Sequence, residues 1–417
     1  MRLLIITHAF SPCRSSNAKR PFYIAKGFLE NGWDVDVITS EFGVRRNGEE
    51  LLCHPNLKII RKRNILITLL NRLLGKGKLD HWYGTLCNLT IWPDIFSPWV
   101  KSLYKGTTDF SSYDRVLGFV LPASILLAGR RKNLVNSRWT FDFQESVSPH
   151  RKLYPRRSPL VKILSGKLEQ LERDTLHKAG SVVFTANSNR QAYIQAGLVP
   201  EETAEHVPYF YDEEAFARPG TVGKLFEIGY YGNFDLTGSR NPATFLAALA
   251  GFLERHPEAR EQTRFTFHGT WIASHDILLD ELDLRDVCRI EKAVSYQEYL
   301  EKIKQSPVLL LVVAEAHNLF MPSKIVDYFG ARRPILAFVP PKSEMHEVLV
   351  EAGMEDFLCG DTDVDGGIQA LESLWTAHLA RSLNVDSSKT SKWASSCQIA
   401  RYIQILKAPV DRKGTAI

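Results

Sequence analysis

The sequence has little that would indicate disulfides, a zinc site or a membrane span. Its 417 residues include six cysteines, which are scattered and show no Cys-x-x-Cys spacing. Such cysteines favour neither a disulfide framework nor a structural zinc site, and they suit a reducing compartment. No apolar run is long enough to cross a bilayer, and the apolar start at residues 1–10 lacks the cleavage site of a signal peptide. We therefore expect a cytoplasmic protein.

Signatures of nucleic-acid and metal binding are also missing. The net charge of +5 is modest, and no aromatic-rich basic stripe or known binding motif accompanies it. No pair of acids with Asp-x-Asp spacing stands beside a plausible diphosphate-binding loop, so we expect neither a metal ion nor a cofactor. Nucleic acid is not an expected partner.

What the sequence does have is the composition and alternation of an α/β protein. Hydrophobic residues make up 44% and charged residues 24%, which are globular values, and 417 residues suit two domains. We expect two doubly wound Rossmann-like domains facing across a cleft, with the ligand outside the carboxyl ends of the parallel strands. The expected domains are residues 1–210, residues 211–390, and a helix at 391–417 that packs back on the first domain.

Strand-like and helix-like segments alternate twice along the chain. Pro, Gly and acids gather around residues 208–223, where the periodicity lapses, and this lapse predicts the domain boundary. Ser295 and Glu298 have the spacing of a capping box that opens a helix. The expected strands are 3–7, 34–39, 115–118, 139–143, 181–185, 226–230, 264–267, 288–292 and 308–314. The other expected helices are 18–30, 122–129, 159–178, 188–196, 242–254 and 394–406.

Residues 319–339, LFMPSKIVDYFGARRPILAFV, form the most informative stretch. Pro322 at the start, Ser323 and Lys324 in the first turn and Gly330 at the end predict a short helix whose N-terminus can hold an anion. Asp327 lies one turn into this helix, where a carboxylate suits the vicinal diol of a ribose. The pattern predicts a nucleotide-diphosphate site. Alternatively, the serine only caps the helix, and the lysine pairs with Asp327.

A basic amphipathic segment interrupts the first half. Nine Lys and Arg residues between positions 45 and 78 surround an apolar run at 65–70. One interpretation is a surface, at residues 58–78, that rests on anionic lipid headgroups and holds the protein on the inner face of the membrane. The alternative is an ordinary helix with a solvated basic rim.

Several segments carry a resemblance to a known family. In the first half these are THAFSPCRSSNAKRPFYIAKGFLENGWDVDVIT at 7–39, IWPDIFSPW at 91–99, WTFDFQES at 139–146 and HVPYFYDEEAF at 206–216. In the second half they are GYYGNF at 229–234 and PSKIVDYFGARRPILAF at 322–338. Together they resemble GT-B fold glycosyltransferases, and are similar to glycosyltransferase family 4 and its relatives in bacterial surface-polysaccharide assembly. The likeness spans nearly the whole chain.

The resemblance implies an enzyme that is hexosyltransferase-like and metal-independent. It would move a sugar from a nucleotide-diphosphate sugar to a hydroxyl of a sugar or lipid-linked acceptor, in cell-surface polysaccharide or glycolipid assembly. The family usually carries two glutamates with seven residues between them, and here the first position is Leu319 and the second is Asp327. The chain also departs from the family at Gln144 and Glu145, which replace Arg and Asp. These departures leave open whether the reaction retains or inverts the anomeric configuration.

The resemblance also implies roles for individual residues. Arg240 and Lys324 would stabilise the leaving diphosphate, and Asp142 or Glu145 would take the acceptor proton. The alternatives are a surface position for Arg240, a local hydrogen bond for His8, and helix capping for the two acids. The implied donor-binding residues are Ser15, Ser16, Gly232, Arg240, Ser323, Lys324 and Asp327, and the implied acceptor-side residues are His8, Asp142 and Glu145.

Two other functions fit the same pattern. A non-hydrolysing sugar-nucleotide epimerase has the same two-domain build, but it needs a pair of acids on either side of one sugar carbon. A catalytically silent scaffold that binds a synthase partner is permitted by the apolar Leu319.

Overall fold

The structure is a computed structural model of the 417-residue chain. It describes residues 1–13, 16–41, 52–65, 92–103, 109–129, 134–149, 159–234, 240–314, 319, 321–383 and 385–408. The chain divides into two compact units. The first unit is Met1–Pro208 together with the chain from Gln398 onward, and the second is Tyr209–Cys397.

The first unit is built on a parallel sheet of seven strands in the order β3-β2-β1-β4-β5-β6-β7. The chain builds outward from β1 to β3 and then starts again on the other side of β1 with β4, so the strand order reverses between β1 and β4. The strands are β1 Arg2–Ile6, β2 Asp34–Ser40, β3 Leu57–Lys62, β4 Arg115–Phe119, β5 Trp139–Phe143, β6 Ser181–Phe184 and β7 Ala204–His206.

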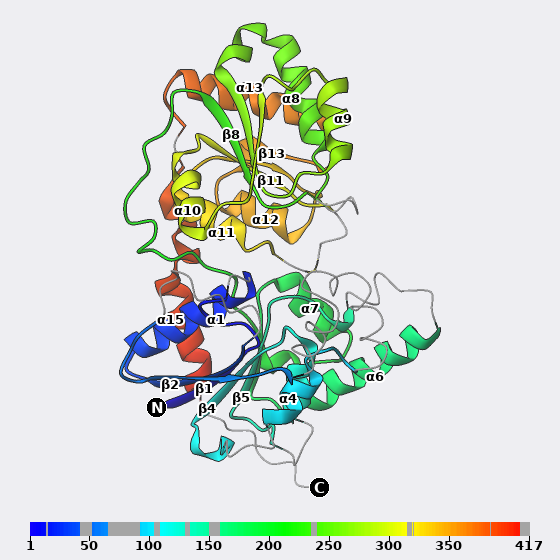
Figure 1. Ribbon diagram of the computed structural model, residues 1–417, viewed down its shortest axis with the longest axis vertical. Helices are drawn as coiled ribbons and strands as arrows, with labels where there is room; N and C mark the ends of the chain where they lie inside the picture. The colour runs from blue at the N-terminus through cyan, green and yellow to red at the C-terminus, as the bar shows by residue number, and fades with distance from the viewer. Residues whose placement is uncertain are drawn as a thin grey trace. The chain divides into compact units, whose positions relative to one another are not determined.

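Helices cover both faces of this sheet because its strands are apolar on both sides. On one face, α4 (Ser97–Leu103), the 3-10 helix η3 (Ala123–Gly129), α6 (Pro159–Leu176) and α7 (Asn187–Gln195) surround a continuous buried core. On the other, α1 (Lys19–Glu30) and α15 (Ser395–Lys407) lie side by side (Figure 1). Their close approach needs Gly27, since a Cβ there would stand 2.5 Å from Ile399 Cγ2.

The second unit has a parallel sheet of six strands in the order β10-β9-β8-β11-β12-β13. Here the order reverses between β8 and β11. The strands are β8 Phe226–Tyr231, β9 Thr263–His268, β10 Cys288–Glu291, β11 Val308–Val312, β12 Ile335–Phe338 and β13 Leu358–Cys359. Two parallel Rossmann-like sheets confirm the predicted fold class.

Helices also lie on both faces of the second sheet (Figure 1). The helices α8 (Ala243–Arg255), α9 (Ala273–Glu281) and α13 (Val364–Leu379) pack over a core that includes Tyr230 and Phe338. The opposite helices are α10 (Tyr296–Gln305), α11 (Lys324–Ala331) and α12 (Glu344–Glu351). The predicted capping box is confirmed, because the Ser295 and Glu298 side chains each accept a hydrogen bond from the other's backbone N–H.

The predicted limits of α11 are wrong at both ends. The helix begins at Lys324 rather than Pro322, and it continues through Gly330 to Ala331. Arg332, with a φ of 56°, supplies the left-handed residue that ends it. Gly330 has a packing role instead: a Cβ at this position would stand 2.4 Å from the Phe216 ring. A glycine near a helix end is ambiguous between these two uses.

Candidate functional site

The candidate site of the second unit lies where its strand order reverses. Parallel β8 and β11 are neighbours in the sheet, with Ile228 opposite Val308. Gly232 follows β8, and Ser323 and Lys324 stand at the start of the helix that follows β11. In open α/β sheets, loops at such a point form the ligand-binding crevice. Three of the predicted donor residues, Gly232, Ser323 and Lys324, therefore lie at this point of the sheet.

Lys324 has a buried ammonium group that no described residue pairs with. Its Nζ is sealed from solvent and hydrogen-bonds nothing in the described part of the chain, although the residue as a whole is only half-buried. Nζ stands 3.9 Å from the centroid of the Tyr230 ring. That ring attracts the cation through its π-face but supplies no negative charge. The alternative in which Lys324 pairs with Asp327 is not formed.

The electrostatics of Lys324 follow from this lack of a counter-charge. Burial, and to a smaller extent the nearby Arg240 guanidinium, lower the pKa of Lys324 to about 7. Arg240 precedes α8, the helix that follows β8, and the Asn241 side chain accepts a hydrogen bond from Ala243 N at 3.0 Å. Two cationic side chains thus stand close enough to repel each other, which is an arrangement that an anion would stabilise.

Gly232 allows the backbone to approach Lys324. Its φ of 142° lies in the region that side-chain-bearing residues rarely adopt, and a Cβ would stand 3.3 Å from Lys324 Nζ. Its N–H donates to His268 O at 2.9 Å, which joins the ends of β8 and β9. Ser323 precedes the first helical residue, and its side chain makes no capping hydrogen bond, so the capping alternative is not formed either.

Asp327 accepts a hydrogen bond from a tyrosine of a neighbouring helix. The residue is buried, with 6% of its surface exposed. One of its carboxylate oxygens accepts a hydrogen bond from Tyr299 Oη at 3.1 Å. Tyr299 comes from α10, so this contact joins two helices of the same face.

In the first unit, His8 lies just beyond β1, at the point where that strand order reverses. Its ring packs against Phe96 with centroids 5.1 Å apart, and its Nδ1 is buried without a hydrogen-bond partner among the described residues. Burial lowers the pKa of His8 to about 4, although contact with the Leu121 backbone opposes the shift. The imidazole is therefore neutral at pH 7. Ser15 and the Ser16 side chain lie outside the described residues.

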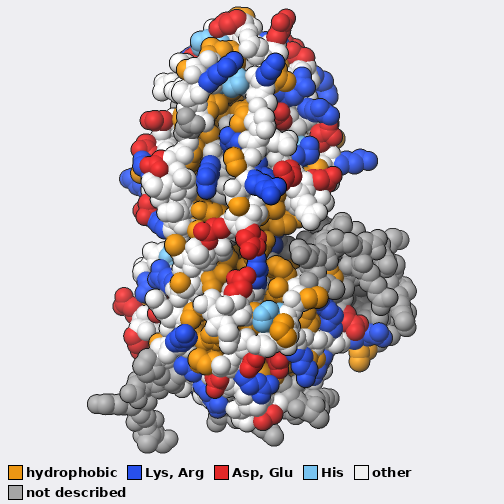
Figure 2. Space-filling view, turned by 90° about the vertical axis from the view of Figure 1, so that its left-hand side faces the viewer, with side chains coloured by type: hydrophobic (Ala, Val, Ile, Leu, Met, Phe, Trp, Pro, Cys, Tyr) orange, Lys and Arg blue, Asp and Glu red, His pale blue; other side chains and the backbone are white. Residues whose placement is uncertain are grey.

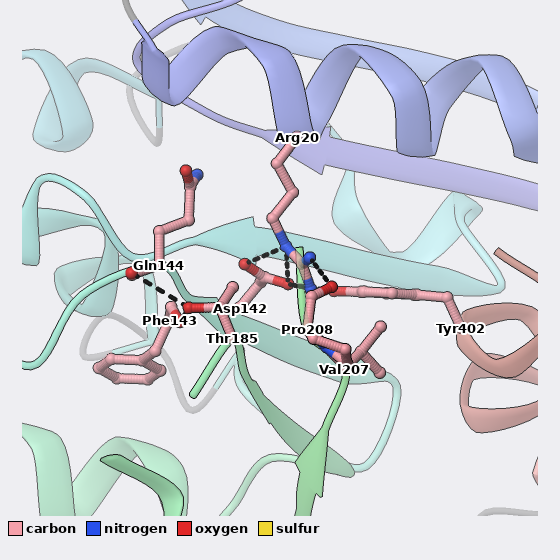
Figure 3. Close-up of polar contacts among 8 residues, drawn as sticks. All are labelled: Arg20, Asp142, Phe143, Gln144, Thr185, Val207, Pro208 and Tyr402. Atoms are coloured by element: carbon pink, nitrogen blue, oxygen red, sulfur yellow. Dashed lines mark hydrogen bonds and ion pairs between the residues drawn. The ribbon is translucent and has the colours of Figure 1, made fainter. Parts of the chain in front are cut away.

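Asp142 does not have the environment predicted for a general base. Arg20 Nε donates to both oxygens of the Asp142 carboxylate, at 3.1 and 2.9 Å, and Tyr402 Oη donates to one of them at 2.9 Å (Figure 3). Neither side chain of the ion pair is more than 1% exposed. The donors on the carboxylate and its burial leave no access for an acceptor hydroxyl, so we withdraw the predicted catalytic and acceptor-side role of Asp142.

Glu145 is the more accessible of the two predicted acids. It lies two residues beyond β5 and is exposed, while the neighbouring Gln144 is buried. Thr185 Oγ1 donates to the Gln144 carbonyl at 3.1 Å, which fixes the start of this loop. The structure thus separates the two acids into one structural and one solvent-facing carboxylate.

The basic segment is only partly described, and its described cations do not lie on a helix. Lys58, Arg61 and Lys62 lie on the edge strand β3, where an amphipathic helix was an alternative, and residues 66–78 lie outside the described residues. Arg61 Nη2 donates to the Ser11 carbonyl, so this cation is not purely a surface charge. Figure 2 shows Lys and Arg interspersed with Asp and Glu on one face.

The described residues also carry no group of three His, Cys, Asp or Glu side chains arranged to hold a metal ion. None of the helices searched in this part of the chain is long and apolar enough to cross a membrane. One open pocket of about 550 Å³ runs along α10, lined by Ala215, Gln297, Glu298, Leu300, Glu301 and Lys302. It includes none of the predicted site residues.

Comparison with known proteins identifies the fold. No family model matches the sequence, and no curated protein matches it. Among solved structures, sucrose-phosphate synthase from Thermosynechococcus elongatus matches with a TM-score of 0.63 at 12% identity, over 97% of this chain and 98% of that one. The E. coli trehalose-6-phosphate structure bound with UDP-2-fluoro glucose gives 0.64 at 14%, over 99% and 100%.

WaaG, a glycosyltransferase involved in lipopolysaccharide biosynthesis, gives a TM-score of 0.58 at 11% identity, over 98% of this chain and 100% of that one. Identities this low show the fold and leave family 4 membership as an expectation. The chain has the GT-B fold of glycosyltransferases, with Rossmann-like sheets of seven and six strands.

Proposed function

We propose that the chain is a glycosyltransferase that takes its sugar from a nucleotide-diphosphate donor. The observation that carries the proposal is the sealed, unneutralised ammonium of Lys324 where the second sheet reverses its strand order. A buried charge without a protein partner is unfavourable, and the diphosphate of a donor would supply the missing partner. The GT-B fold supports the same choice, and so does the similar E. coli trehalose-6-phosphate structure, which is bound with UDP-2-fluoro glucose.

The proposed chemistry is electrostatic. As the donor sugar becomes oxocarbenium-like, negative charge develops on the departing diphosphate, and preorganised cations stabilise it. Lys324 would contact the diphosphate, Arg240 would add positive charge, and Gly232 would let the phosphates approach the backbone. Asp327 would accept hydrogen bonds from the ribose hydroxyls. No metal ion is assigned a part in these steps.

The acceptor side of the proposal rests on the first unit. Because Asp142 is buried in an ion pair, Glu145 remains as the proposed general base. It is exposed and lies just after the end of β5. His8 is the proposed sugar contact, since it is neutral near pH 7 and can accept a hydrogen bond through an unpartnered nitrogen. Ser15 and Ser16 keep their proposed donor role from the family resemblance alone.

For the acceptor, we propose a sugar or a lipid-linked hydroxyl in cell-surface glycan assembly. Support comes from the family resemblance and from the similar structure of WaaG, a glycosyltransferase involved in lipopolysaccharide biosynthesis. A lipid-linked acceptor would lie at headgroup level, so peripheral attachment to an anionic membrane through residues 58–78 is part of this proposal. Liposome sedimentation at low and high salt would test it, since electrostatic attachment weakens as salt rises.

The direct experiment is a donor screen followed by a transfer assay. A panel of UDP-glucose, UDP-N-acetylglucosamine, GDP-mannose, ADP-glucose and dTDP-rhamnose would be tested for thermal stabilisation, because ligand at a hundred times its Kd adds about 2.7 kcal/mol. The stabilising donor would then be incubated with and without lipid-linked and free-sugar acceptors. We expect one donor to stabilise the protein and its sugar to move only when an acceptor is present.

The same assay separates the alternatives. Epimerisation of the donor without any acceptor would identify an epimerase, and binding without turnover on any acceptor would favour the silent scaffold. Lys324→Met should be compared with the wild type in the same assay, since methionine keeps the apolar stem of the side chain but removes its charge. If neither the wild type nor this variant responds to any donor, the proposed function is wrong.

A further inference from the structure

The Tyr299–Asp327 hydrogen bond joins α10 to the helix that carries Lys324. Tyr299 Oη stands 3.1 Å from Asp327 Oδ2, and both side chains lie within the second unit. Asp327 comes three residues after Lys324 on α11, so the two charged groups lie about one turn apart along the helix. The hydroxyl therefore acts on the carboxylate that the proposed function assigns to the ribose.

Packing holds the Tyr299 ring in a defined place. Its edge meets the Tyr231 ring at 72°, with centroids 5.5 Å apart, and it stacks on Tyr296 at 5.8 Å. The Tyr231 hydroxyl is in turn within 3.0 Å of Ser306 Oγ. The capping box at Ser295 and Glu298 fixes the helix end from which Tyr299 projects. A hydroxyl on such a supported ring is a stationary donor.

A stationary donor matters because of what a ribose requires. Two vicinal hydroxyls bind a carboxylate well only when its oxygens already point at them, because fixing a free side chain on binding costs conformational entropy. Burial and the neighbouring Asp327 carboxylate raise the pKa of Tyr299 well above its ordinary value. The phenol thus stays protonated, and its donated hydrogen bond persists over the whole physiological range.

We propose that Tyr299 is a positioning residue for donor recognition: its hydroxyl fixes the Asp327 carboxylate in the orientation that receives the ribose diol of a ribonucleoside diphosphate. This inference rests on the proposed function. It assigns to α10 a role in the donor site, and it makes recognition of the ribose depend on a contact between two helices.

The test measures how strongly the protein distinguishes ribose from 2′-deoxyribose. UDP, GDP, ADP and CDP would be titrated by calorimetry, and the tightest would be compared with its 2′-deoxy counterpart. A hydrogen bond to a charged group contributes about 1.5–3 kcal/mol, so loss of the 2′-hydroxyl should weaken wild-type binding by about tenfold or more. We call the Kd for the 2′-deoxynucleotide divided by the Kd for the ribonucleotide the deoxy ratio. In Tyr299→Phe the deoxy ratio should fall to about threefold or less. In the same variant kcat at saturating donor should stay within about twofold of the wild-type value, while KM rises.

Two further variants isolate the contact. Tyr296→Phe removes a hydroxyl from the adjoining ring of the same helix and should keep the wild-type deoxy ratio. In Asp327→Asn the deoxy ratio should fall close to one. Adding Tyr299→Phe to this variant should lower the deoxy ratio little further, because the effects of two substitutions that break the same contact are not additive. A purely structural role for Tyr299 would lower the melting temperature without changing the deoxy ratio.

The outcomes distinguish this inference from the function on which it rests. If the wild type binds a ribonucleoside diphosphate and Tyr299→Phe keeps the full deoxy ratio, the positioning role is overturned and the donor site stands. If the effects of Tyr299→Phe and Asp327→Asn simply add, the role is overturned as well. If none of the four nucleotides binds the wild type, the donor site itself fails, and the inference fails with it.

Discussion

Arg20 and Asp142 form a buried ion pair in which one guanidinium nitrogen, Nε, bonds both oxygens of the carboxylate, at 3.1 and 2.9 Å. The other two nitrogens of Arg20 donate to the carbonyls of Val207 and Pro208, at 2.8 and 2.9 Å (Figure 3). Pro208 is the last residue before the chain enters the second unit, and Tyr402 belongs to the segment that returns to the first. The ion pair and its hydrogen bonds therefore join α1, β5 and α15 to the two residues that follow β7.

Breaking this ion pair should destabilise the first unit. Asp142→Ala leaves the Arg20 guanidinium buried and without its carboxylate, and removal of one partner of a buried pair typically costs about 3–5 kcal/mol. Tyr402→Phe removes one hydrogen bond and should cost about 1 kcal/mol. Urea unfolding followed by circular dichroism would measure both.

The same variants decide between the structural and catalytic roles of Asp142. Donor binding should persist in Asp142→Ala at a temperature where the protein remains folded, because the proposed diphosphate and ribose contacts, Lys324, Arg240 and Asp327, belong to the second unit. A variant with the wild-type unfolding midpoint and greatly reduced turnover would instead restore Asp142 as a general base.

Removal of the Lys324 ammonium should lower turnover more than any surface change. We expect Lys324→Ala to reduce kcat by at least about a hundredfold, which is the effect of removing one preorganised donor at a developing negative charge. Lys224→Ala, an exposed lysine of the same unit, is the matched control and should retain the wild-type rate. A folded Lys324→Ala protein with a near-normal rate contradicts the assignment.

Donor affinity should depend on pH through Lys324. In the free protein the pKa of Lys324 is lowered to about 7, so the group is protonated below that pH and increasingly neutral above it. A bound diphosphate favours the charged form and raises the pKa, so binding above pH 7 takes up a proton. Affinity for a nucleotide sugar should fall by up to about tenfold per pH unit above 7. Calorimetry in buffers of different ionisation enthalpy would detect the proton.

The unliganded fold should gain stability when this charge is removed. The folded-state pKa of Lys324 lies below its unfolded value, so the unfolded chain binds the extra proton, and stability rises with pH from about 7 toward 10.5. Lys324→Met should therefore melt at a higher temperature than the wild type at pH 7 and bind donor more weakly. A lower melting temperature would indicate that the ammonium stabilises the free fold.

Activity should not require a divalent metal. Lys324, Arg240 and the start of α11 already provide positive charge at the proposed diphosphate site, which is the role that a metal ion would otherwise perform. Turnover should survive treatment with EDTA followed by gel filtration. A rate that falls to background and returns on adding Mg²⁺ or Mn²⁺ would show that the diphosphate site has been misassigned.

The sequence predicted the fold class and most central strands because their hydrophobic periodicity is strong. The strand at residues 139–143 is confirmed with its limits as β5. The strand β3 was not predicted, because its sequence, LKIIRK, has as many cations as apolar residues. Periodicity cannot separate such a strand from a basic amphipathic helix.

The candidate site was predictable where it depends on local sequence, and less so where it depends on tertiary contacts. Ser323, Lys324 and Asp327 follow from one helix start. The burial of Asp142 depends on Arg20, which is distant in sequence, although Arg20 has helical spacing with the apolar Ile24 and Phe28. An Arg in line with a buried stripe is a signal for an internal ion pair. Nothing local to Tyr299 indicated its contact with Asp327.

The most direct test of the central claim is calorimetric titration of UDP, GDP, ADP, CDP and dTDP into the wild-type protein and into Lys324→Met, at pH 6.5 and low salt. The account predicts that at least one nucleoside diphosphate binds the wild type and that its Kd rises by about tenfold or more in Lys324→Met, the loss of a charge-assisted contact. Equal affinity for the two proteins, or binding of none of the five nucleotides to the wild type, would contradict it.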